Sequence, residues 1–104
     1  MAKMTTASLL KMKQNGEKIS TITAYYASFS KLFEQAGIHA ILIGDSLGMV
    51  IQGNNDTLPV TVDEMAYHTR AVANGVSDTL VIADLPFMSY ATKEQAYVNA
   101  TKLM

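Results

Sequence analysis

Two aspartates follow two apolar segments of this chain, and together they could bind a cation. Asp45 directly follows the segment 40–44, and Asp84 directly follows the segment 79–83. Each segment is typical of a strand buried on both faces, and a helical pattern separates the two. Parallel strands joined in this way end at the same edge of a sheet, so we expect both carboxylates there. Because two carboxylates repel each other unless a cation lies between them, the sequence indicates an acidic metal site.

The residues beside Asp45 add groups that could bind an anionic ligand. Gly44 has no Cβ atom and therefore lets a ligand approach the backbone closely. Ser46 offers a hydroxyl and a backbone N–H, two donors that could hold a carboxylate. Mg²⁺ takes oxygen ligands, keeps several waters and often uses only one or two protein carboxylates, so Asp45 and Asp84 suffice. An aspartate after a strand also commonly caps the next helix, and this structural interpretation stays open.

Other polar residues are weaker candidates for a catalytic or binding role. Tyr25 and Tyr26 follow a shorter strand pattern and could reach the same edge, but the sequence assigns them no role. His39 and His68 lack the spacing of zinc ligands. His39 precedes a strand at the opposite edge, and His68 falls on a helix flank that we expect to lie far from the strand ends. We therefore interpret both histidines as structural.

Composition restricts the class of protein. The 104 residues suffice for one small domain, and 49% of them are hydrophobic, which is typical of a globular protein. A net charge of −1 and a single arginine argue against a nucleic-acid surface. The absence of cysteine excludes disulfides and thiolate sites within this chain. No apolar run approaches membrane-spanning length and no targeting segment is evident, so we expect a cytoplasmic protein.

Helix and strand patterns alternate along the chain. We expect strands over 20–25, 40–44 and 79–83, and helices over 5–14, over 27–35, from Thr61 to Gly75 and after Thr92. Thr61 with Glu64 forms a capping box, and Thr92 with Gln95 forms a second one.

Apolar spacing supports one of these helices, and one connection is unusually long. Phe29, Leu32, Phe33 and Ala36 form a helical stripe in the segment 27–35 and just beyond it. The segment 45–59 is long for a strand-to-helix connection and is typical of a functional loop, in which 49–51 could form an extended piece.

Three strand–helix units predict an α/β fold that is part of a larger protein. Three parallel strands alone would leave sheet edges open, and the last helical pattern has no stop signal before Met104. A complete (β/α)8 TIM barrel needs about 250 residues. We therefore expect residues 1–104 to be the truncated N-terminal portion of a single barrel domain, its first three βα units.

Five stretches resemble the ketopantoate hydroxymethyltransferase family, in the family's order and spacing. They are 21–25, 43–49, 56–61, 67–72 and 83–88. The likeness runs from about Thr5 to Met104. The combination of Gly-Asp-Ser-Leu-Gly-Met, which starts at Gly44, and Ala-Asp-Leu-Pro-Phe-Met, which starts at Ala83, is highly specific.

The resemblance implies a (β/α)8 barrel of the phosphoenolpyruvate/pyruvate superfamily. It implies hydroxymethyl transfer from 5,10-methylenetetrahydrofolate to 3-methyl-2-oxobutanoate, giving 2-dehydropantoate in pantothenate biosynthesis. Asp45 and Asp84 match the family's Mg²⁺ ligands, and Ser46 joins them in contacting the oxo acid. Members of the family are commonly homo-oligomers, often decamers.

Two features depart from the family pattern. Tyr26 stands where the family usually has an aspartate. The family's further metal-site carboxylate, its substrate-binding lysine and its catalytic glutamate base would lie beyond Met104, so we expect no catalytic base within this chain and no activity from it alone. Two other interpretations stay open. One is another Mg²⁺-dependent lyase or mutase of the same superfamily that acts on an oxo acid. The other is a non-catalytic barrel fragment that associates through its sheet edges.

Overall fold

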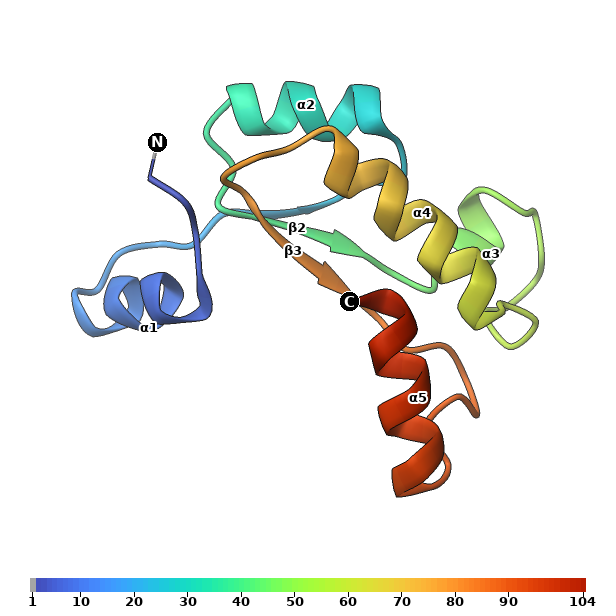
Figure 1. Cartoon of the computed structure of the whole chain (residues 1–104). Coiled ribbons are helices and arrows are strands. Elements are labelled where there is room, and N and C mark those ends of the chain that lie inside the picture. Colours follow the sequence, from blue (N-terminus) through green and yellow to red (C-terminus); the bar gives the residue numbers. More distant parts are fainter. Residues whose placement is uncertain (1) are drawn as a thin grey trace.

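The structure is a computed structural model that describes residues 2–104, and its three strands form one parallel sheet in the order β1-β2-β3. The elements in chain order are α1 (Thr6–Gln14), β1 (Thr21–Thr23), α2 (Ala27–Gln35), β2 (Ala40–Ile43), α3 (Leu47–Val50), α4 (Val62–Asn74), β3 (Leu80–Ala83) and α5 (Lys93–Leu103). Figure 1 shows α2 and α4 lying over the same side of the sheet. In the described residues, no helix is both long and apolar enough to cross a membrane.

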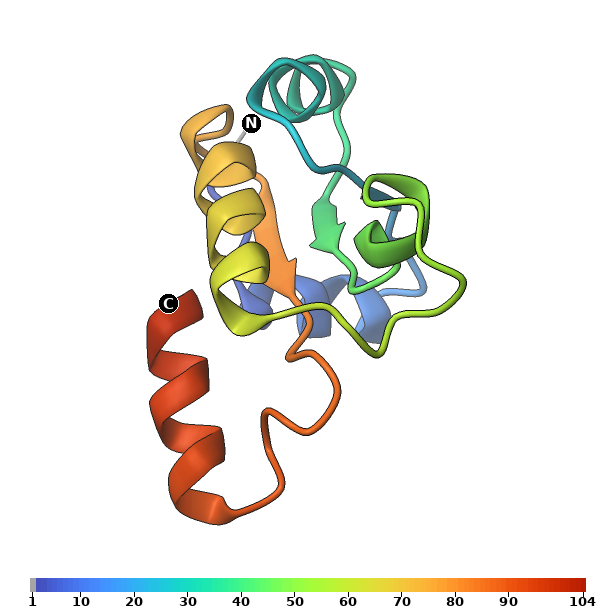
Figure 2. The ribbon, with the colours of Figure 1, turned by 90° about the vertical axis from the view of Figure 1, so that its right-hand side faces the viewer.

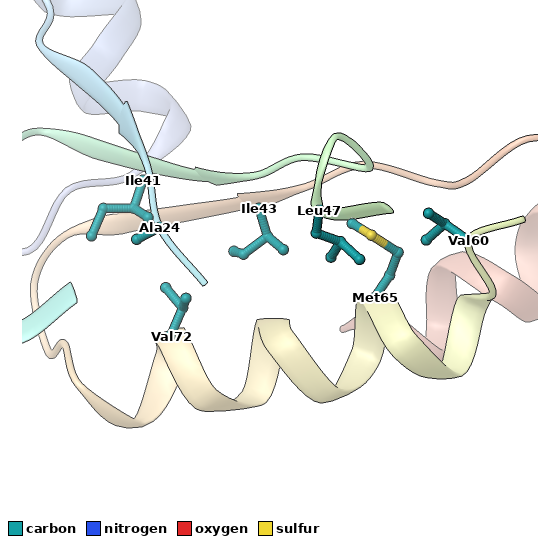
Figure 3. Close-up of a cluster of buried hydrophobic side chains, with 7 residues drawn as sticks. All are labelled: Ala24, Ile41, Ile43, Leu47, Val60, Met65 and Val72. Carbon is teal, nitrogen blue, oxygen red and sulfur yellow. The ribbon is translucent and has the colours of Figure 1, made fainter. Parts of the chain in front are cut away.

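The core lies between the sheet and α4. Ile41 and Ile43 on β2 are completely buried and point toward Met65 and Val72 of α4 (Figure 3). Leu47, just beyond the end of β2, is also completely buried. Because α4 runs back along the strands, its first half lies at the carboxyl edge of the sheet (Figures 1 and 3).

The other face of the sheet is partly open. Ile82 of β3 is 40% exposed, and Leu42, its partner in the parallel register, is only half-buried. Thr21 and Thr23 of β1 are exposed as well. The sheet is therefore well covered on the α4 side and only partly covered on the opposite side (Figure 2).

Helices α2 and α4 approach each other closely at a serine and a glycine. The buried Ser30 hydroxyl lies 2.9 Å from the carbonyl oxygen of Val72 and 3.0 Å from that of Ala27. A Cβ atom on Gly75 would collide with the Ser30 hydroxyl and the Ala27 carbonyl oxygen. The close contact thus requires glycine at position 75, although its φ is −90° and needs no left-handed conformation.

The apolar stripe of α2 is only partly buried, since Phe33 packs against the core and the other large side chains do not. Phe29 and Leu32 are 54% and 56% exposed, and Ser30 is the buried residue of the helix. The reason is that α2 approaches α4 through its small residues, which turns Phe29 and Leu32 outward. The exposed Phe29 stacks on the partly buried Phe33, with ring centroids 6.1 Å apart.

The connection after β2 also differs from the prediction. An extended piece was expected over 49–51, but the short helix α3 occupies Leu47–Val50. A Cβ atom on Gly48 would lie 2.5 Å from Val60 Cγ2, so glycine lets the returning loop pack against α3. Beyond β3, Met88 adopts a left-handed backbone conformation with φ of 61°, which is uncommon for a residue other than glycine.

Most predicted helix boundaries are confirmed. The capping box of α4 is complete, because Glu64 N–H donates to Thr61 Oγ1 and Thr61 N–H donates to Glu64 Oε1. At α5 the box is only half formed. The Thr92 side chain accepts from Gln95 N–H, but the Gln95 side chain accepts from Ala91 N–H instead of Thr92.

A carboxylate on α2 holds the connection between α4 and β3. Glu34 accepts hydrogen bonds from the backbone N–H groups of Ser77, Asp78 and Thr79 and from the Thr79 hydroxyl. Partial burial of Glu34 raises its pKa, but these hydrogen bonds, led by the one from Thr79 N–H, lower it more. The net result is a pKa of about 2, down from its ordinary value of 4.5.

The substitution Glu34→Gln should lower the free energy of unfolding at neutral pH by about 1–3 kcal/mol, since the charged acceptor is lost. The folded pKa lies below the unfolded one, so the stabilisation is complete above pH 4.5 and is lost as pH falls toward 2. Urea unfolding followed by circular dichroism at several pH values measures this difference, with the exposed Glu17→Gln as the control. A Glu34→Gln deficit that stays constant from pH 7 to pH 2 would contradict the assignment.

Candidate functional site

The two predicted aspartates lie at the same edge of the sheet. Ile43 of β2 is paired with Ala83 of β3, and Asp84 N–H continues the ladder by donating to the Ile43 carbonyl at 3.0 Å. The backbone N–H of Asp45 donates to Asp84 Oδ2 at 3.2 Å. The expectation that both residues emerge together at the carboxyl edge is therefore confirmed.

Gly44 lies beside two of the side chains that were predicted to bind ligand, Ser46 and Asp84. A Cβ atom built on it would lie 3.3 Å from Ser46 Oγ and 3.5 Å from Asp84 Oδ2. The two side-chain oxygens therefore converge over the Gly44 backbone. A glycine at this position leaves space beside both oxygens that any other residue would fill.

Tyr25, which follows β1, contacts one of these residues. Its phenolic oxygen lies 2.9 Å from Ser46 Oγ, and either hydroxyl could be the donor. The sequence placed Tyr25 at this edge but did not indicate its contact, because the contact joins residues 21 positions apart through side chains. Tyr26, by contrast, is 44% exposed and begins α2 without a side-chain capping bond.

The prediction that His68 lies far from the strand ends was wrong. His68 is buried, and its Nδ1 lies 2.9 Å from the backbone carbonyl oxygen of Tyr25. A carbonyl can only accept, so Nδ1 is the donor. The error came from treating position 68 as a helix flank, whereas the second turn of α4 lies against the carboxyl edge of the sheet. The rings of Tyr25, Tyr26 and Tyr67 meet the imidazole edge to face, the nearest with its centroid at 5.2 Å.

His39 lies where the sequence placed it, at the amino edge of the sheet. Ser20 N–H donates to His39 Nδ1 at 3.0 Å, and His39 N–H donates to Ser20 Oγ at 3.1 Å. These reciprocal bonds join the starts of β1 and β2. The structural interpretation of His39 agrees with this arrangement.

The donor atoms at the carboxyl edge fit a hard cation. The residues that follow the three strands offer oxygen atoms for this purpose, namely the carboxylates of Asp45 and Asp84 and the hydroxyls of Ser46 and Tyr25. Among residues 2–104 there is no cluster of three or more histidine, cysteine or acidic side chains that could hold a metal ion. Two carboxylates with water in the remaining positions is a set that suits Mg²⁺.

Comparison with known proteins assigns this arrangement to a family. The sequence profile described as ketopantoate hydroxymethyltransferase matches residues 3–104, nearly the whole chain. The chain belongs to the ketopantoate hydroxymethyltransferase family.

Curated relatives of the ketopantoate hydroxymethyltransferase family agree with the profile. Proteins from Colwellia psychrerythraea, Aeromonas salmonicida and Pseudoalteromonas atlantica, each named 3-methyl-2-oxobutanoate hydroxymethyltransferase, are 74%, 67% and 66% identical to it over 104 residues. Each match covers 100% of this chain and 39% of the relative's length. The chain thus spans less than half the length of these family members.

Gly44→Ala should weaken metal binding without unfolding the protein, because the new methyl group would fill the space beside Asp84 Oδ2, 3.5 Å away, and press on the neighbouring Ser46 hydroxyl. The loss is expected to be about tenfold, as for other changes beside metal ligands. Water-proton relaxation with Mn²⁺ measures it in a chimera, in which this chain replaces the matching segment of the Colwellia relative. Gly44→Val should lose more affinity than Gly44→Ala. Equal affinity across the series would show that the space over Gly44 is not used.

Proposed function

We propose that this chain forms the first part of the active site of a 3-methyl-2-oxobutanoate hydroxymethyltransferase. The observation that carries the proposal is the convergence of two family motifs at one sheet edge, where Asp45 N–H meets the Asp84 carboxylate at 3.2 Å and Ser46 Oγ lies nearby over Gly44. The names of the relatives support the same reaction.

The proposed reaction moves a one-carbon unit onto a branched oxo acid. 5,10-Methylenetetrahydrofolate supplies the unit, 3-methyl-2-oxobutanoate accepts it at C3, and the product is 2-dehydropantoate, which serves pantothenate biosynthesis. The acceptor needs its carboxylate held and its C3 proton removed. The residues of this chain suit the first of these tasks.

Asp45 and Asp84 would hold Mg²⁺ in this proposal. The bound ion supplies Lewis acidity that polarises the 2-oxo group and makes the C3 proton more acidic. The hydroxyl and backbone N–H of Ser46 hold the substrate carboxylate, which is a positioning role. Asp84 has a second task, since its carboxylate also fixes the backbone at Asp45.

The base that removes the C3 proton is proposed to lie outside these 104 residues. Asp45 and Asp84 follow β2 and β3, and the proposal assigns both carboxylates to the metal. The partly open face of the sheet around Leu42 and Ile82 supports the same conclusion, since further strands of a (β/α)8 barrel would cover it. We propose that residues 1–104 are the N-terminal portion of that barrel domain, because the relatives are more than twice as long.

The chain alone should not catalyse deuterium exchange at C3 of 3-methyl-2-oxobutanoate, whereas the chimera with the Colwellia relative should. Mass spectrometry of the oxo acid in deuterated buffer with Mg²⁺ measures this exchange. The chimera should also form 2-dehydropantoate when the folate is added. Exchange by the chain alone would contradict the placement of the base, and a folded chimera without exchange would contradict the function.

Asp84→Asn in the chimera should lower kcat/KM by about 100-fold or more, because changes beside metal ligands already cost 10- to 100-fold. The asparagine keeps an acceptor for Asp45 N–H, so the thermal midpoint should change little. Asp63→Asn on the exposed first turn of α4 is the matched control and should leave the rate unchanged. If the Asp84→Asn chimera is active, the Asp84 carboxylate is not a ligand of the metal.

A further inference from the structure

We infer that Tyr25 is a positioning residue whose hydroxyl donates to Ser46 Oγ and so directs the Ser46 proton at the substrate carboxylate. The inference rests on the proposed function, because it concerns the substrate group assigned to Ser46. It adds a residue that follows β1 to a site whose other members follow β2 and β3. The argument depends on the 2.9 Å contact between the two hydroxyls and on what fixes Tyr25.

The direction of the hydrogen bond decides what Ser46 can do. Each hydroxyl has one proton, so if Ser46 donated to Tyr25 it would present only lone pairs to an incoming carboxylate. A phenol is a stronger donor than an aliphatic hydroxyl. When Tyr25 donates, the Ser46 proton is free, and the hydrogen bond received at Oγ polarises it further. A carboxylate can only accept hydrogen bonds, so a bound carboxylate favours the arrangement in which Tyr25 donates to Ser46.

Tyr25 is fixed from two sides before any ligand binds. The ladder between β1 and β2 extends to its neighbour, since Ala24 N–H donates to the Leu42 carbonyl at 3.2 Å. The Tyr25 carbonyl in turn accepts from His68 Nδ1 at 2.9 Å. The Tyr25 ring is half-buried and meets the imidazole of His68 edge to face at 6.1 Å. These contacts hold the phenol in place, so the orientation of Ser46 is set in advance.

Loss of the phenolic hydroxyl should therefore affect binding of the oxo acid more than chemistry. The Ser46–carboxylate contact forms with the substrate and persists through the reaction, so its weakening raises Kd and KM and leaves kcat nearly constant. Tyr25→Phe retains the ring and its contact with His68, which separates the hydroxyl from packing. Its effect should vanish when Ser46 is already alanine, because the hydroxyl then has nothing to orient.

The test is a double-mutant cycle of Tyr25→Phe and Ser46→Ala in the chimera. Isothermal titration with 3-methyl-2-oxobutanoate and Mg²⁺ gives Kd, and steady-state kinetics separate kcat from KM. Tyr25→Phe should raise Kd threefold to tenfold with kcat within twofold, and the double variant should match Ser46→Ala. Tyr97→Phe, an exposed tyrosine on α5, is the matched control and should change neither value. Additive effects in the cycle, or a Tyr25→Phe variant with unchanged Kd, would overturn the inference.

A second readout does not depend on activity. Side-chain NMR couplings in the full 104-residue chain report the χ1 rotamer of Ser46. One rotamer is expected in the natural chain and in Tyr97→Phe, and averaging among rotamers is expected in Tyr25→Phe. If Ser46 is fixed by Tyr25 but the chimera is inactive, the proposed function fails and the contact stands. If Ser46 is equally ordered without the phenol, the inference fails whatever the chimera does.

Discussion

The parallel pairing of three consecutive strands is the constraint on which the site depends. Neighbouring strands that run in the same direction end at the same edge of the sheet. The residues that follow these strands therefore lie near one another. The backbone ladder carries this arrangement past the strand ends, as Asp84 N–H bonds to Ile43 and Ala24 N–H bonds to Leu42. The backbone at Asp84 and beside Tyr25 is therefore fixed by hydrogen bonds.

Helix α4 connects the hydrophobic core with this edge. Met65 and Val72 on one face are completely buried against the sheet, and that packing sets the height of the helix above the strands. His68 lies between them in sequence, is buried as well, and donates from Nδ1 to the Tyr25 carbonyl. The core and the polar edge are consequently parts of the same packing arrangement, and a change to one alters the other.

The sequence was sufficient for the order of the elements other than α3 and for the placement of Asp45 and Asp84, because these follow from strand direction and from local capping signals. It was insufficient for His68 and Tyr25, whose contacts join side chains that are distant in the chain. The sequence was also insufficient for the burial of α2. Apolar periodicity assumes that large side chains face the core, but the glycine at position 75 brings a neighbouring helix so close that only Ser30 fits there.

The contact at Gly75 has a genetic consequence. Every missense change of a glycine codon adds a Cβ atom, and at this position that atom meets the backbone carbonyl of Ala27 as well as the Ser30 hydroxyl. A side chain can rotate away, but a carbonyl inside a helix cannot move without shifting the whole helix. Codon 75 therefore has no conservative replacement, and inherited variation there is expected to be purged even though the residue touches no ligand.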